Sequence, residues 1–138
     1  MQGDRASREK PLVLIADDDA TVRFLVREAL EIAGFAVEDV ADGCSAVSAF
    51  DTLRPDLIIL DVRMPGMDGF SACATIRNCP FGRDVPILML SGMNVADIAE
   101  HAAAAGATGV ISKPFSLAKL GQHVWEVLRQ SSGTFPQR

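Results

Sequence analysis

The 138-residue chain lacks the patterns that define several large protein classes. Its three cysteines, Cys44, Cys73 and Cys79, have no C-x-x-C spacing, so we expect reduced thiols and neither a disulfide framework nor a zinc site. Phosphate-binding motifs of the G-x-G-x-x-G or P-loop type are absent, which argues against nucleotide binding. No apolar run approaches the roughly 18 residues of a membrane span, and residues 1–10 hold no apolar stretch typical of a signal peptide. We therefore expect a cytoplasmic protein without membrane insertion.

The chain also has fewer positively charged than negatively charged residues. The chain has 13 lysine and arginine residues against 18 acidic ones, a net charge of −5. This balance gives no electrostatic footprint for nucleic acid, so direct nucleic-acid binding is not expected. With 49% hydrophobic and 22% charged residues, the composition is that of an ordinary globular domain. The length corresponds to about one domain.

Short apolar runs alternate with helical stripes along the chain. Runs fit for burial on both faces predict five strands, over residues 11–16, 35–40, 57–60, 85–90 and 108–111. Apolar residues at helical spacing predict a helix after each strand, with Gly34, Pro55 and Gly106 as breakers. Repeated strand-helix units with short connections predict an α/β fold, in which helices cover both faces of a parallel sheet.

Polar residues follow four of the predicted strands. Asp17 and Asp18 follow the first strand, Asp61 the third, Ser91 the fourth and Lys113 the fifth. With strand order 2-1-3-4-5, these strands are neighbours, and ligands bind at the carboxyl edge of such sheets. Carboxylates suit Mg2+, whereas a hydroxyl and an ammonium suit phosphoryl oxygens that the metal leaves uncovered. An aspartate beside a bound metal can attack a phosphoryl group to form an acyl phosphate.

At these positions the chain resembles the receiver domain of two-component response regulators. The resemblance covers roughly residues 10–130 and rests on the acidic pair, the segment D-V-R-M-P-G-M-D-G at 61–69, Ser91, and K-P-F at 113–115. It implies a flavodoxin-like (βα)5 fold, a doubly wound parallel sheet of order 2-1-3-4-5. It also implies that Asp61 accepts a phosphoryl group from a partner histidine kinase or phosphotransfer protein.

The resemblance assigns a metal site to the acidic residues. Asp17, Asp18 and Asp61 would hold Mg2+, together with the backbone carbonyl of Arg63. Arg63 is longer than the side chain that the family often has here, and its position bears on the rate of dephosphorylation.

The remaining roles in the resemblance concern the phosphoryl group and its signal. Ser91 would bind the phosphoryl group, Lys113 would pair with it, and the peptide bond from Lys113 to Pro114 would be cis. Val110 departs from the pattern, because many receivers have an aromatic residue there that moves during signal transmission. For Trp125, which lies off the apolar stripe of the last helix, two interpretations stay open: a contact on the output face, or a partly buried tryptophan without a partner.

The resemblance also implies a domain organisation. We expect a flexible segment over residues 1–10, the receiver over 11–130, and a short tail over 131–138 with no output domain. Such a phosphoprotein would not be an enzyme. It would signal through phosphorylation-dependent protein interaction, or act as a phosphorelay component or phosphate sink.

An alternative comes from a different class of protein. The segment D-D-D-A-T at 17–21 resembles the D-x-D-x-T motif of haloacid-dehalogenase-type phosphatases, with Asp17 as nucleophile and Asp19 as general acid. That family needs a further acidic metal-binding motif after the lysine, and no aspartate follows Asp97. A purely structural pseudo-receiver is disfavoured, because all the acidic, hydroxyl and lysine positions are kept.

Other polar residues receive structural interpretations. We expect Asp19 and Asp68 to be helix caps or solvated acids, and His101 and His123 to be surface residues without a metal.

Overall fold

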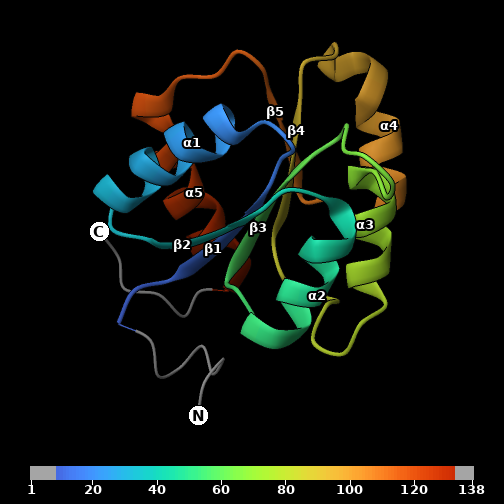
Figure 1. The fold of residues 1–138 in the computed structure, drawn as a ribbon, viewed down its shortest axis with the longest axis horizontal. Coiled ribbons are helices and arrows are strands. Elements are labelled where there is room, and N and C mark those ends of the chain that lie inside the picture. Colours follow the sequence, from blue (N-terminus) through green and yellow to red (C-terminus); the bar gives the residue numbers. More distant parts are fainter. Residues whose placement is uncertain (1–8, 133–138) are drawn as a thin grey trace.

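The computed structural model describes residues 9–132, in which a five-stranded parallel sheet lies between two layers of helices (Figure 1). The strands pair in the order β2-β1-β3-β4-β5, which confirms the predicted fold class and strand order. In chain order the elements are β1 (Leu12–Ala16), α1 (Ala20–Ile32), β2 (Ala36–Val40), α2 (Gly43–Leu53), β3 (Leu57–Asp61), α3 (Gly69–Arg77), β4 (Ile87–Ser91), α4 (Val95–Ala105), β5 (Gly109–Ser112) and α5 (Leu117–Ser132).

The three central strands are buried on both faces. Successive side chains of a strand point to opposite faces, so each strand supplies two separate cores. In β1, Leu14 packs on the side of α2, α3 and α4, whereas Val13 and Ile15 pack on the side of α1 and α5. The same alternation in β3 and β4 explains why these strands are continuous apolar runs.

Helix starts follow the predicted capping chemistry. The side chain of Asp19 accepts hydrogen bonds from the Thr21 and Val22 amides at the start of α1, and Asp68 accepts one from the Ser71 amide at the start of α3. The two acids are therefore caps, as predicted. Caps hold the helix starts next to the carboxyl ends of the strands, where the polar residues gather.

Trp125 of α5 is partly buried and contacts the end of α1. Its indole N–H donates to the carbonyl of Ala33 at 2.9 Å, and its ring stacks on Phe35 with 4.4 Å between centroids. The side chain thus packs, partly buried, at the end of α1, so the contact on the output face is wrong and the partly buried interpretation holds, with Ala33 as a partner that it did not foresee. The physical reason is that Ala33, as the C-cap of α1, has a carbonyl that the helix leaves without a partner.

The structure bears on several smaller predictions. His101 and His123 are exposed, and the three cysteines are free. Helix α5 extends through Ser132, two residues into the expected tail. The other expected terminal residues, 1–8 and 133–138, lie outside the described part of the chain. Within the described part, no helix is both long enough and apolar enough to cross a bilayer.

Candidate functional site

The sheet order brings the predicted polar residues to one edge. Asp17 and Asp18 directly follow β1, which pairs with β3, and Asp61 is the last residue of β3. Ser91 ends β4 and lies opposite Ser112 of β5, one residue before Lys113. The amide of Lys113 donates to the carbonyl of Ser91 at 2.7 Å, which fixes the start of the loop after β5. The peptide bond between Lys113 and Pro114 is cis, as predicted.

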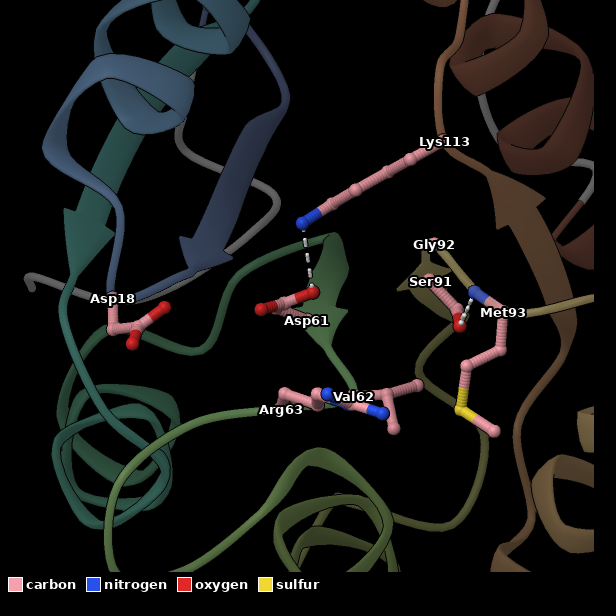
Figure 2. Close-up of a pocket in the computed structure, with 8 residues that line it drawn as sticks. All are labelled: Asp18, Asp61, Val62, Arg63, Ser91, Gly92, Met93 and Lys113. Atoms are coloured by element: carbon pink, nitrogen blue, oxygen red, sulfur yellow. Dashed lines mark hydrogen bonds and ion pairs between the residues drawn. The ribbon is translucent and has the colours of Figure 1, made fainter.

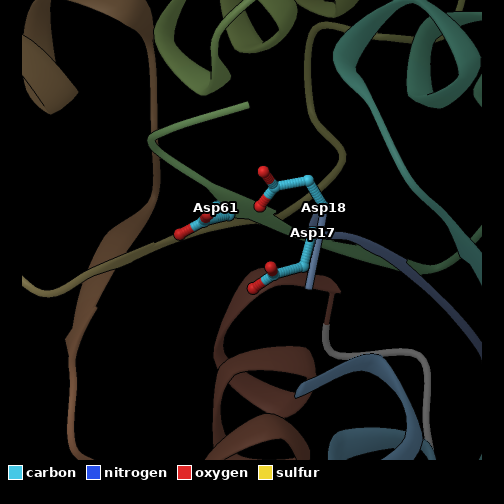
Figure 3. Close-up of side chains that lie close together, drawn as sticks. All are labelled: Asp17, Asp18 and Asp61. Atoms are coloured by element: carbon cyan, nitrogen blue, oxygen red, sulfur yellow. The ribbon is translucent and has the colours of Figure 1, made fainter. Parts of the chain in front are cut away.

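The acidic residues form a compact cluster. One carboxylate oxygen from each of Asp17, Asp18 and Asp61 lies within 4.8 Å of the other two. Figure 3 shows the three carboxylates pointing in the same direction from the ends of two neighbouring strands. Asp17 and Asp61 are buried, whereas Asp18 is exposed to solvent.

The side chain of Lys113 reaches across the site to the acids (Figure 2). Its ammonium lies 3.1 Å from Asp61 Oδ1 and 3.6 Å from Asp17 Oδ2. Burial alone would lower the pKa of Lys113, but its contacts with Asp61 and Asp17 outweigh burial and raise that pKa. Lys113 therefore remains a cation at neutral pH.

The environment of Asp61 disfavours its charged form. Burial is the largest effect and raises the pKa of Asp61; the hydrogen bond from Lys113 opposes it, and the charges of Asp17 and Asp18 add to it. The net direction is upward. A buried carboxylate with a raised pKa in a pocket is typical of a functional site.

Ser91 occupies the far side of the same pocket. Its hydroxyl is buried and accepts a hydrogen bond from the amide of Met93 at 2.9 Å (Figure 2). The pocket has a volume of about 390 Å3, and Arg63 lines it with an exposed side chain. The lining residues are Asp18, Asp61, Val62, Arg63, Ser91, Gly92, Met93 and Lys113. Every predicted site residue except Asp17 borders this pocket.

One site neighbour was not predicted from the sequence. Arg23 of α1 donates from Nη1 to the carbonyl of Asp17 at 2.8 Å, and its Nε pairs with Asp39 at 2.9 Å. Arg23 lies on the polar face of an amphipathic helix, and such a position gives no signal in the sequence that the side chain will contact a neighbouring loop. The contact depends on where α1 lies relative to the loop after β1.

Comparison with known proteins agrees with this geometry. A family model for the response regulator receiver domain matches residues 13–125. The chain belongs to this family. Response regulator MprA of Mycobacterium sp. (strain KMS) is 37% identical over 122 residues, which make up 87% of this chain and 51% of that protein. The receiver thus spans about half the length of the curated relatives it matches.

Two solved receiver structures show the same likeness. The chemotaxis response regulator CheY4 of Vibrio cholerae is 36% identical, with a TM-score of 0.81 over 86% of this chain and 98% of that chain. The receiver domain of sensor histidine kinase PA1611 from Pseudomonas aeruginosa is 30% identical, with a TM-score of 0.78 over 91% of this chain and 99% of that chain. That structure has a magnesium ion coordinated in its active site cleft.

Family membership decides between the two interpretations of the acidic segment. The chain is the receiver domain of a two-component response regulator, a signalling domain, and not a haloacid-dehalogenase-type phosphatase. The geometry agrees, because Lys113 lies closer to Asp61 than to Asp17.

Proposed function

We propose that this receiver accepts a phosphoryl group on Asp61 in a Mg2+-dependent reaction. The donor is a phosphohistidine on a histidine kinase or a phosphotransfer protein. The observation that carries the proposal is the position of Asp61. Among the described residues, it is the one carboxylate that shares a cluster within 4.8 Å with two further acids, lies 3.1 Å from a lysine ammonium, and lines the same pocket as Ser91.

The transfer is an exchange of two bonds to phosphorus. A carboxylate oxygen of Asp61 attacks the phosphorus atom, and a new O–P bond forms as the P–N bond to the donor imidazole breaks. The electron pair of the P–N bond stays on the imidazole nitrogen, which takes up a proton. Because phosphoryl transfer depends mainly on positioning and charge neutralisation, Lys113 and Ser91 act as fixed donors for the phosphoryl oxygens.

The acidic cluster fits a magnesium ion. Asp17 Oδ1 accepts a hydrogen bond from the amide of Asp19 at 2.9 Å, whereas Asp17 Oδ2 is buried and accepts no hydrogen bond within the described chain. A buried carboxylate oxygen without a hydrogen-bond donor destabilises the fold unless a cation lies against it. The ammonium of Lys113 lies 3.6 Å from Asp17 Oδ2, which is longer than a hydrogen bond. Hard oxygen ligands are what Mg2+ prefers.

We assign the metal to Asp17, Asp18, Asp61 and the backbone carbonyl of Arg63. When bound, Mg2+ supplies positive charge that offsets both the carboxylates and the phosphoryl oxygens. The magnesium ion in the PA1611 receiver domain supports this assignment. The phosphorylated receiver would then signal through a protein partner, or pass its phosphoryl group along a relay.

Borohydride trapping with mass mapping tests the proposal. The receiver is incubated with Mg2+ and a panel of phosphorylated histidine kinases, reduced with borohydride, and digested. We expect reduction to mark Asp61, and Asp61→Asn to abolish acceptance, while Asp51→Asn, an equal charge change on the exposed end of α2, leaves it intact. Acceptance that is unchanged in EDTA, or a label on Asp17, would contradict the proposal.

A further inference from the structure

Arg23 ties together the three segments that surround the acidic pair. From α1, its guanidinium donates to the carbonyl of Asp17 at 2.8 Å and pairs with Asp39 of β2 at 2.9 Å. The amide of Asp17 in turn donates to the carbonyl of Val40 at 3.2 Å. Both backbone groups of Asp17 are therefore held, the N–H group by β2 and the carbonyl by α1.

The carbonyl that Arg23 holds has a particular place in the chain. It belongs to the peptide unit that joins Asp17 to Asp18, and this unit is planar and rotates as one body. A change in ψ of Asp17 or in φ of Asp18, the two torsions that flank this unit, would move one carboxylate relative to the other. A hydrogen bond to this one carbonyl therefore constrains the relative position of both acids.

The pairing with Asp39 reduces the repulsion between Arg23 and a cation at the acidic cluster. A guanidinium so close to the acidic cluster would repel a divalent cation, because arginine is always charged. The Asp39 carboxylate lies 2.9 Å from Arg23 Nε and 3.5 Å from Arg27 Nη2, so it offsets part of the Arg23 charge, and it also fixes the direction of the Arg23 guanidinium fork. Arg23 therefore orients the Asp17 peptide while its own charge is partly offset by Asp39.

We infer that Arg23, held by Asp39, is a positioning residue that keeps Asp17 and Asp18 arranged for Mg2+ binding. The inference rests on the proposed function, since it concerns the same metal site. It predicts an effect on metal affinity that is separate from any effect on folding.

Arg27 provides a matched control one helical turn away. It also pairs with Asp39, at 3.5 Å, and donates to a β2 carbonyl, that of Val37, at 2.8 Å. Its exposed fraction, 30%, is close to the 21% of Arg23. Among the contacts of the described chain, however, only the guanidinium of Arg23 reaches the Asp17 carbonyl.

The experiment is a Mg2+ titration of the 15N-labelled chain at constant ionic strength, followed by amide chemical shifts. Wild type, Arg23→Gln and Arg27→Gln are compared, and the thermal midpoint of each is measured in EDTA. We expect Arg23→Gln to bind Mg2+ about tenfold more weakly, as found for partners of metal ligands, and Arg27→Gln to stay within about twofold of wild type. The two variants should have similar metal-free midpoints, because they lose similar surface contacts.

Two further variants cover the case in which Arg23→Gln does not fold. Arg23→Lys keeps the charge but offers a single ammonium in place of the fork, so its Mg2+ affinity should lie between those of wild type and Arg23→Gln. Asp39→Asn leaves the guanidinium uncompensated and should also weaken Mg2+ binding.

The outcomes separate the inference from the proposed function. If wild type binds Mg2+ and the Arg23 variants bind it equally well, or if Arg27→Gln loses as much affinity, the positioning role is refuted and the proposed function stands. If wild type itself binds no Mg2+, the metal-dependent function fails and the inference fails with it.

Discussion

Replacing Asp61 by asparagine should stabilise the metal-free receiver at neutral pH. The carboxylate is almost completely buried, with a side-chain exposure of 7%, and its pKa lies above the ordinary value of 3.8 because of burial. A raised pKa in the folded state means that folding favours the protonated form. The stabilising contribution is complete below the unfolded pKa and is lost as the pH rises through the folded pKa. At neutral pH the charged Asp61 therefore opposes folding, and the neutral amide removes that opposition.

The size of the effect follows from the balance of charges around Asp61. At an effective dielectric constant of about 20, the ammonium of Lys113 at 3.1 Å contributes an attraction of about 5 kcal/mol. Repulsion from Asp17, with carboxylate oxygens within 4.8 Å, is at least about 3 kcal/mol, and Asp18 adds to it. These terms nearly cancel, so desolvation decides the sign. We expect Asp61→Asn to raise the free energy of unfolding by about 1 kcal/mol, which is usual for relief of a strained functional site.

Thermal and denaturant unfolding in EDTA between pH 4 and pH 8 measures this. A gain of about 1 kcal/mol corresponds to a rise in Tm of about 3 to 6 °C for a domain of this size, and the gain should shrink toward acid pH. Added Mg2+ should make wild type more stable than Asp61→Asn. At ten times its Kd, Mg2+ stabilises wild type by about 1.4 kcal/mol, and it should stabilise the variant less. Asp51→Asn, with the same charge change on exposed α2, is the control. A lower Tm for Asp61→Asn in EDTA at pH 7, or a gain that does not vary with pH, would refute the reasoning.

Three further predictions follow from named contacts. Lys113→Met should tighten Mg2+ binding several-fold in a chemical-shift titration, because the ammonium no longer competes for Asp61 and Asp17; unchanged or weaker binding would contradict this. Gly69→Ala should lower the free energy of unfolding, measured by denaturant, by about 1 to 3 kcal/mol, because a Cβ there would collide with the Asp61 carbonyl and the Met89 methyl. Gly92 has open space around its Cα, so Gly92→Ala should change the free energy of unfolding by less than about 0.5 kcal/mol in the same assay. Trp125→Phe should cost about 1 kcal/mol through loss of the hydrogen bond to Ala33, and an unchanged Tm would show that the indole contact contributes nothing.

The fold could be predicted from the sequence because its signals are local. Each central strand is an apolar run buried on both faces, and the breakers Gly34 and Gly106 adopt positive φ at helix ends. The predicted strands over 85–90 and 108–111 are displaced by one or two residues from β4 and β5, since Pro86 precedes β4 and the pairing register decides where β5 begins. Patterns of burial indicate which segments are strands, but pairing sets their ends.

Hydrophobic periodicity could not predict the side-chain contacts between distant elements. Trp125 lies off the apolar stripe of α5, so the sequence left open whether it forms a contact on the output face or is partly buried. The structure places it against the end of α1, where the Ala33 carbonyl accepts its N–H. Arg23 likewise occupies a polar position on α1, and a stripe does not show whether such a residue faces water or a neighbouring loop. Both cases depend on how two distant segments meet.

The location of the candidate site could be predicted from the sequence because its acidic residues stand where apolar residues are expected. Charged residues are buried in proteins only when something pays for their desolvation, yet Asp17 and Asp61 follow apolar strands directly and are buried. Such a conflict between local pattern and burial is expected at functional sites, where stability is given up for chemistry. The negative charge of the acids is not fully compensated within the described chain. Lys113 contacts two carboxylates at once, and Asp17 Oδ2 accepts no hydrogen bond there. The same unbalanced negative charge that should make Asp61→Asn more stable is therefore what should give the receiver its affinity for Mg2+.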